Sequence, residues 1–187
     1  MKYLKLFLAL SFLPAVCFAQ QPTVDNDFVQ KQFGATCRVD ENSNVISTAD
    51  LNGDGIDDAV IVAHCKNPLI DEAEHNFKVL DPYNAFFGYS DPKVTSQFAS
   101  EDPGSRGRVL LVIHGNGADA WRSSEPKAKF VIINLPFQQV GVKRLMLKKK
   151  PVSAIFAEES GGEHTNSALF WDGKKYHYQP LGTGLED

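Results

Sequence analysis

Nine residues in the first third of the chain, Asp50 to Asp58, space oxygen-bearing side chains as a hard cation requires. If Asp50 is position 1, side-chain oxygens occupy positions 1, 3, 5 and 9, and a backbone carbonyl is available at position 7. Gly55, at position 6, permits the sharp reversal that turns alternate residues toward one centre. Calcium takes about six to eight oxygen ligands and is the cation that this set predicts. The predicted ligands are Asp50, Asn52, Asp54, Ile56 (through its carbonyl) and Asp58.

Two other interpretations of these residues, an EF-hand and a metal-free turn, fit less well. An EF-hand needs a bidentate glutamate at position 12, where this chain has Ile61, and helices where the sequence favours strands. Asp, Asn and Gly also form ordinary turns, but the four carboxylates of this loop would then repel one another without compensation. Asp57 lies out of phase with the ligand positions, so we expect it to face solvent. We therefore predict a calcium ion with a stabilising role.

The stretch from Ala49 to Val62 resembles the calcium-binding loop of FG-GAP and VCBS-type repeats. The resemblance rests on the acidic loop with its glycine and on the apolar, strand-forming run Ala59 to Val62 that follows. It implies a calcium-binding turn between two strands. A propeller needs several such repeats, and the chain contains one.

The N-terminus predicts export. Lys2 and Lys5 precede an apolar stretch from Leu6 to Val16, and Ala19 offers a small residue for cleavage, so residues 1–19 are interpreted as a signal peptide. A lipoprotein with Cys17 modified fits less well, because Val16 stands where a small residue is wanted. The apolar stretch is shorter than the ~20 residues of a spanning helix, and no later segment is long and apolar enough. We expect a secreted or periplasmic protein with no transmembrane segment after signal removal.

Residues 20–187 suffice for a single domain with its own core. The whole chain carries a net charge of −4 and becomes more acidic once the lysines of the signal are removed, which argues against a nucleic-acid partner. Cys37 and Cys65 remain after cleavage, and in an oxidising compartment such a pair predicts a disulfide. That bridge would enclose the acidic loop.

The pattern of the mature chain predicts a mainly β, β-rich α+β fold, an antiparallel sheet or sandwich with one N-terminal helix. The helix is expected over Asp25 to Phe33, with Gly34 as its stop. Asp172-Gly173 between aromatic strands predicts a hairpin. The expected strands are Val45–Thr48, Ala59–Ala63, Val109–Ile113, Phe130–Ile133, Val142–Leu147, Ala154–Ala157, Ala168–Trp171 and Lys175–Tyr178.

The segment from Lys66 to Gly107 carries prolines and aromatic residues and is too apolar for a disordered linker. We expect a long packed connection, with a helical turn near Asp71 to Phe77 and a short strand at Ala85 to Phe87.

Two groups of residues suggest catalysis. The strand Val109 to Ile113 runs into His114-Gly115-Asn116-Gly117, which resembles the oxyanion-hole strand of α/β-hydrolases, but no Gly-x-Ser-x-Gly elbow occurs. Glu158 and Glu159 with His164 could serve acid–base chemistry, although a solvated loop is the simpler interpretation. None of the five histidines forms a zinc pattern with Cys37 or Cys65.

Two surface features also have a simple and a functional interpretation. Lys143-Arg144 and Lys148 to Lys150 could bind an anionic polymer, or form the solvated face and turn of a hairpin. The aromatic side chains Trp171, Tyr176 and Tyr178 could form a carbohydrate platform, or pair across strands.

The sequence as a whole predicts an exported, calcium-binding, non-enzymatic binding or interaction module whose protein or glycan partner it does not identify. The alternatives are a small exported hydrolase that uses the His114-Gly115 turn or the Glu158/Glu159/His164 cluster, and a subunit of an envelope complex.

Overall fold

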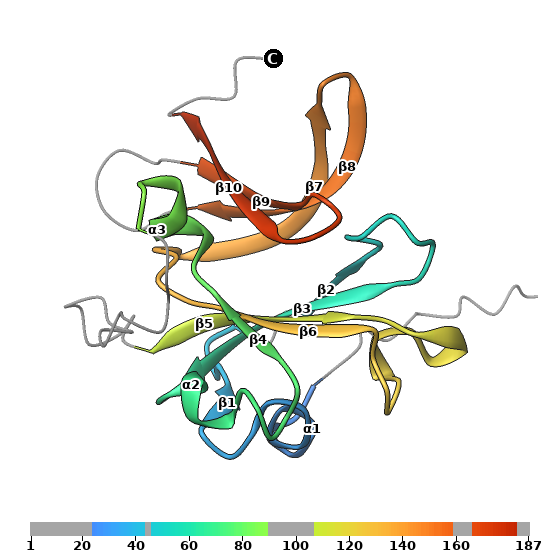
Figure 1. Cartoon of the computed structure of the whole chain (residues 1–187), viewed down its shortest axis with the longest axis vertical. Helices are drawn as coiled ribbons and strands as arrows, with labels where there is room; N and C mark the ends of the chain where they lie inside the picture. Colours follow the sequence, from blue (N-terminus) through green and yellow to red (C-terminus); the bar gives the residue numbers. More distant parts are fainter. Residues whose placement is uncertain (1–23, 44–45, 90–106, 159–165, 183–187) are drawn as a thin grey trace, which may run out of the picture.

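The computed structural model describes residues 24–43, 46–89, 107–158 and 166–182, and these form two β-sheets with short helices around them. Figure 1 shows sheet A in the middle of the molecule, with α1 (Asn26–Phe33) on one side of it and sheet B on the other. The predicted β-rich fold with an N-terminal helix is confirmed. The predicted signal peptide lies outside the described residues.

Sheet A contains the acidic loop. Its strands run in the order β1-β3-β5-β6-β4, and β2 pairs with the part of β3 that β1 leaves free. All its pairings are antiparallel except that of β4 with β6. The strands are β1 (Cys37–Val39), β2 (Ile46–Ala49), β3 (Asp58–Cys65), β4 (Lys78–Leu80), β5 (Arg108–His114) and β6 (Ala128–Ile132).

Sheet B is an antiparallel meander in which each strand pairs with the next one along the chain. The predicted hairpin at Asp172-Gly173 joins its last two strands. The basic run forms the first hairpin, whose exposed turn is Lys148-Lys149, so its interpretation as a hairpin turn is confirmed. The strands are β7 (Gln139–Leu147), β8 (Lys150–Glu158), β9 (Asn166–Trp171) and β10 (Tyr176–Gly182).

Both faces of sheet A are buried, and this explains why its central strands are apolar at nearly every position. Successive side chains of a strand point to opposite faces. Ile61 and Leu111 therefore pack against α1, whereas Val60 and Leu110 pack against sheet B. The same alternation points Asp58, the first residue of β3, and His114, the last residue of β5, toward sheet B.

Helix α1 begins and ends where its sequence predicts. The Asp25 carboxylate accepts a hydrogen bond from the backbone N–H of Phe28, and Gly34 follows the last turn. Val29 and Phe33 are fully buried against sheet A. Lys129 of β6 donates a hydrogen bond to the Gln32 carbonyl at 2.7 Å and so fixes the helix end to the sheet.

The segment after Lys66 differs from its prediction. The short strand expected at Ala85 to Phe87 is wrong, because α3 (Pro82–Phe86) includes Ala85 and Phe86, and Phe87 is the residue that ends this helix. Asp81 caps this helix through the N–H of Asn84, and proline suits its first position. The expected helical turn lies slightly earlier, at α2 (Pro68–Asp71), and is followed by turns up to Asn76.

The sequence pattern does not predict two short strands of the structure, β1 and β4. Each has three residues, too few for a periodicity to be read from the sequence. Strand β4 lies within the predicted connection and is a parallel edge strand of sheet A. Residues 90–106, the rest of that connection, lie outside the described residues.

The predicted disulfide between Cys37 and Cys65 is confirmed. The two residues face each other across β1 and β3 with their Cα atoms 4.1 Å apart, and both are buried. The bridge encloses β2 and the acidic loop. No helix within the described part of the chain is both long and apolar enough to cross a membrane.

Candidate metal-binding loop and the pocket beside it

The acidic loop is the connection of a hairpin. It spans residues 50–57 and joins β2 to β3, whose register ends at the pair Ala49 and Asp58. Strands therefore flank the loop on both sides, as predicted. Gly55 has a φ of 82°, in the left-handed region that favours glycine, so the chain reverses at the predicted position.

Backbone N–H groups of the loop hold the carboxylate of Asp50 in place. Its Oδ1 accepts hydrogen bonds from the N–H groups of Gly53 at 2.7 Å and Asp54 at 3.1 Å. Its Oδ2 accepts one from Gly55 at 2.9 Å. The loop therefore wraps around an anionic group, and the described residues provide no charged partner for it.

Asn52 and Asp54 repeat the same pattern. The Asn52 side-chain oxygen accepts a hydrogen bond from the N–H of Asp54, and Asp54 Oδ1 accepts one from the N–H of Ile56, both at 2.9 Å. Asp54 Oδ2 pairs with the Lys127 ammonium at 2.7 Å. This hydrogen bond lowers the pKa of the Asp54 carboxyl below its usual value. No sequence pattern points to Lys127, because 73 residues separate it from Asp54.

Asp58 lies at the base of the loop and is fully buried. Its Oδ2 accepts hydrogen bonds from the N–H groups of Leu51 at 2.8 Å and Asn52 at 3.2 Å. Its Oδ1 accepts one from Gly115 at 2.8 Å. Burial raises the pKa of Asp58 to about 6, and the three N–H groups oppose that rise by stabilising the carboxylate. Asp57, by contrast, is exposed, as predicted.

The residue types of the loop fit calcium, but their arrangement divides them into two groups. Asp50, Asn52 and Asp54 are on the exposed or half-exposed side, where an ion can reach them. Asp58 is fully buried, and both it and Asp50 already accept three of the about four hydrogen bonds that a carboxylate can accept. Within the residues that the structure describes, no three His, Cys, Asp or Glu side chains gather closely enough to hold a metal ion. Further oxygens would come from Asn52, the Ile56 carbonyl or water.

The His114-Gly115 turn packs directly against the acidic loop. A Cβ atom on Gly115 would lie 2.4 Å from the Asp57 carbonyl oxygen, so only glycine fits there. The N–H of Gly115 donates a hydrogen bond to the Asp58 carboxylate and is therefore not free to stabilise an oxyanion. This turn serves to anchor the loop.

His114 is buried within a group of aromatic side chains. Its Nε2 is 2.8 Å from the Tyr176 hydroxyl, and its ring lies against those of Phe130 and Trp171. Burial lowers the pKa of His114 to about 4, so the ring is neutral near pH 7. Burial also raises the pKa of Tyr176 well above its usual value, and the nearby Asp58 adds to that rise.

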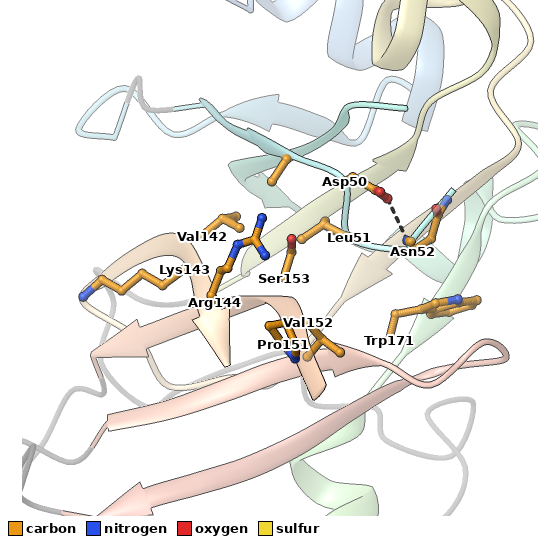
Figure 2. Close-up of a pocket in the computed structure, with 12 residues that line it drawn as sticks. Asp50, Leu51, Asn52, Val142, Lys143, Arg144, Pro151, Val152, Ser153 and Trp171 are labelled. Atoms are coloured by element: carbon orange, nitrogen blue, oxygen red, sulfur yellow. Dashed lines mark hydrogen bonds between the residues drawn. The ribbon is translucent and has the colours of Figure 1, made fainter. Parts of the chain in front are cut away.

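A pocket of about 460 Å³ lies between the acidic loop and sheet B. Figure 2 shows Arg144 extending from β7 toward the loop, with Trp171 on the other side of the pocket and Lys143 pointing away. The pocket thus places an anionic loop opposite a cationic strand. The complete lining is Ala49 to Gly53, Val142 to Arg144, Pro151 to Ser153 and Trp171.

The second predicted catalytic cluster is only partly described. Glu158 ends β8 and lies in register with Gln139 and Asn166, whereas Glu159 and His164 lie outside the described residues. The other histidines are dispersed. His64 lies 3.7 Å from Asp40, and His177 lies 2.7 Å from Asp172.

The predicted aromatic residues of the last hairpin form part of the core. Tyr176 and Tyr178 are buried, and the Trp171 ring packs on that of Tyr176. The predicted cross-strand pairing is therefore confirmed, and the alternative of an exposed carbohydrate platform is wrong. Exposed aromatic side chains instead occur on and after α3, at Phe86, Phe87 and Tyr89.

No family model, no curated protein and no solved structure matches the chain.

Proposed function

We propose that the chain is an exported calcium-binding protein, a non-enzymatic binding or interaction module in which the ion stabilises the β2–β3 hairpin. The observation that carries this proposal is the arrangement of Asp50, Asn52 and Asp54. Their side-chain oxygens alternate along a tight loop whose backbone N–H groups orient them. The likeness of the loop to those of FG-GAP and VCBS-type repeats supports the same assignment.

The charge balance of the loop also favours a cation. Asp50 and Asp54 lie on one short loop, and Lys127 provides the single ion pair of the described loop residues. An exposed pair of this kind contributes only about 0–1 kcal/mol, so it leaves most of the negative charge of the loop available to a cation. A bound divalent ion would neutralise them and join residues that the loop alone holds apart.

Export and a binding role have separate support. The N-terminal pattern of charge and hydropathy is that of a signal peptide, and the Cys37–Cys65 bridge suits an oxidising compartment. The pocket beside the loop offers a site of mixed charge for a polar group of a protein or glycan partner.

The test is a thermal melt of the mature protein in chelator, in calcium and in magnesium. Calcium at about a hundredfold above its Kd should stabilise the fold by about 2.7 kcal/mol, which raises Tm by about 5 °C or more. The variant Asp54→Ala should lose this shift, and Asp57→Ala, on the same loop but facing solvent, should keep it. Identical melting curves in calcium and chelator would contradict the proposal.

The hydrolase alternative has less support. Its first version needs a free N–H at the His114-Gly115 turn and a titrating histidine, but Gly115 donates to Asp58 and His114 is buried against Tyr176. Its second version depends on Glu159 and His164. Turnover of an ester or glycoside substrate that Glu159→Gln abolishes, with the calcium shift unchanged, would favour the hydrolase.

A further inference from the structure

The β7–β8 hairpin concentrates positive charge on an acidic protein. Five basic residues occur among the eight from Lys143 to Lys150, with no acidic residue among them, while the whole chain carries −4. All five are exposed. In Figure 1 the hairpin curves away from sheet A toward the top of the view. The three lysines from Lys148 to Lys150 therefore present a local field of one sign at the end of the hairpin.

These charges have almost no partners within the protein. The Lys143 ammonium lies over the Phe156 ring, 5.7 Å from its centroid. The other four side chains form no hydrogen bond or ion pair with any residue that the structure describes. Folding therefore gains little from them, and their mutual repulsion opposes it.

The turn of the hairpin is unfavourable for the residues that occupy it. Leu147 pairs with Lys150, so the turn has two central residues, Lys148 and Lys149, with φ values of 48° and 66°. Asn-Gly is the usual choice for such a turn, because glycine and asparagine tolerate positive φ. Local strain that packing does not require is a common sign of a functional site.

Apolar side chains lie directly beside the lysines. Met146 is 64% exposed, which is unusual for a large apolar residue on a strand, and Leu145 and Leu147 on either side of it are half-buried. The end of the hairpin is therefore amphipathic. A nucleic acid or a soluble polyanion would use the charges but not the apolar side chains, whereas a lipid surface would use both.

We propose that the end of the β7–β8 hairpin docks on a bilayer that contains anionic phospholipid. The lysines of the turn contact headgroup phosphates, and Met146 enters the interface beside them. This contact is peripheral and does not depend on the calcium loop. It would hold the pocket beside the acidic loop close to the membrane surface, since Arg144 and Pro151 belong to both the pocket and the hairpin.

The experiment is sedimentation of the mature protein with vesicles of phosphatidylcholine, alone or mixed with phosphatidylglycerol. Wild type should bind only the mixed vesicles, and salt should weaken the binding. Lys148→Gln with Lys149→Gln should reduce affinity about 30-fold, at about tenfold for each 1.4 kcal/mol. Lys174→Gln with Lys175→Gln removes equal charge from an exposed turn elsewhere in sheet B and should change affinity little.

A further variant separates binding from folding. Lys148→Asn with Lys149→Gly suits the positive φ values, so it should raise Tm while reducing vesicle binding as the glutamine pair does. Met146→Ser should weaken vesicle binding but leave binding to heparin, a soluble polyanion, unchanged.

Several outcomes would overturn the proposal. Equal binding to both vesicle types excludes anionic recognition, and equal losses from the two glutamine pairs exclude a specific surface. Binding to heparin without binding to vesicles assigns the hairpin to a polyanion instead. If the variant Lys148→Asn with Lys149→Gly binds anionic vesicles as wild type does, the two turn lysines do not contribute to binding.

Discussion

The buried carboxylate of Asp58 accepts a hydrogen bond from the backbone N–H of Gly115 at 2.8 Å. This contact joins the acidic loop to the end of β5, 57 residues further along the chain. The same carboxylate binds the N–H groups of Leu51 and Asn52, so one side chain fixes both the loop and the turn beneath it. A motif typical of metal binding thus also has a structural role that needs no metal.

Asp58→Asn should destabilise the protein by about 2–3 kcal/mol in chelator. The amide has a single acceptor oxygen, and its NH₂ group would face buried N–H donors that lose their partners. Denaturant unfolding gives the difference directly. Asp57→Asn alters an exposed neighbour and should stay within about 0.5 kcal/mol of wild type. Equal effects of the two variants would show that the buried contacts contribute nothing.

Gly115→Ala should be destabilising by about 1–3 kcal/mol, because the new methyl group overlaps the Asp57 carbonyl and forces the turn away from the loop. Gly141→Ala is the matched control. Gly141 lies within β7 rather than in a turn, and a Cβ atom there meets nothing within 4 Å. It should be neutral or slightly stabilising in the same denaturant assay. A neutral Gly115→Ala would mean that the turn does not contact the loop.

Lys127→Met should increase calcium affinity by up to about fivefold. The ammonium occupies Asp54 Oδ2, and the ion must displace it, but the pair is partly exposed, so its contribution is at most about 1 kcal/mol. Isothermal titration calorimetry with calcium measures the change, and Lys174→Met serves as a distant control. Weaker calcium binding by Lys127→Met would instead indicate that the lysine orients Asp54 for the ion.

His114 should make the metal-free protein sensitive to acid. Its folded-state pKa of about 4 lies below the ordinary 6.5, so the unfolded state binds more protons between these values. Its stabilising contribution is therefore complete above pH 6.5 and is lost as the pH falls toward 4. Unfolding free energies in chelator across this range measure the loss, and His114→Phe should flatten that slope.

Asp58 acts in the opposite sense over nearly the same range. Its folded-state pKa of about 6 lies above the ordinary 3.8, so its contribution is present below pH 3.8 and is lost as the pH rises through 6. The two groups partly cancel in wild type. Asp58→Asn should therefore steepen the acid loss, and a slope unchanged by both variants would exclude either group as its source.

The Cys37–Cys65 bridge should contribute about 3.6 kcal/mol, because it closes a loop with a sequence separation of 28. The double variant Cys37→Ala with Cys65→Ala avoids a buried polar replacement and should lower the unfolding free energy by that amount. Thiol titration of the oxidised, denatured protein without residues 1–19 should find no free thiol. A full complement of free thiol would show that the two cysteines do not pair under those conditions.

Much of this architecture could be predicted from local pattern alone. Helix α1 has a cap, two apolar residues that become buried and a terminal glycine, all within ten residues. The longer strands have enough β-branched residues to be recognised, and the acidic loop is identified by spacing that involves neighbours only. Local pattern does not predict the three-residue strands β1 and β4, because tertiary packing rather than local propensity selects such short elements. Helix α3 does have local signals, the Asp81 cap and Pro82 at its first position, and the strand expected there is wrong.

The sequence by itself determined the acidic loop, its flanking strands and the cysteine pair around it, because these depend on residue type and short spacing. Only the tertiary structure decided how the loop's carboxylates are used. It buries Asp58 beneath Gly115 and brings Lys127 to Asp54. It also places Arg144 across a pocket from Asp50. Such contacts follow from strand register and sheet packing over long separations, which no local pattern of side chains encodes.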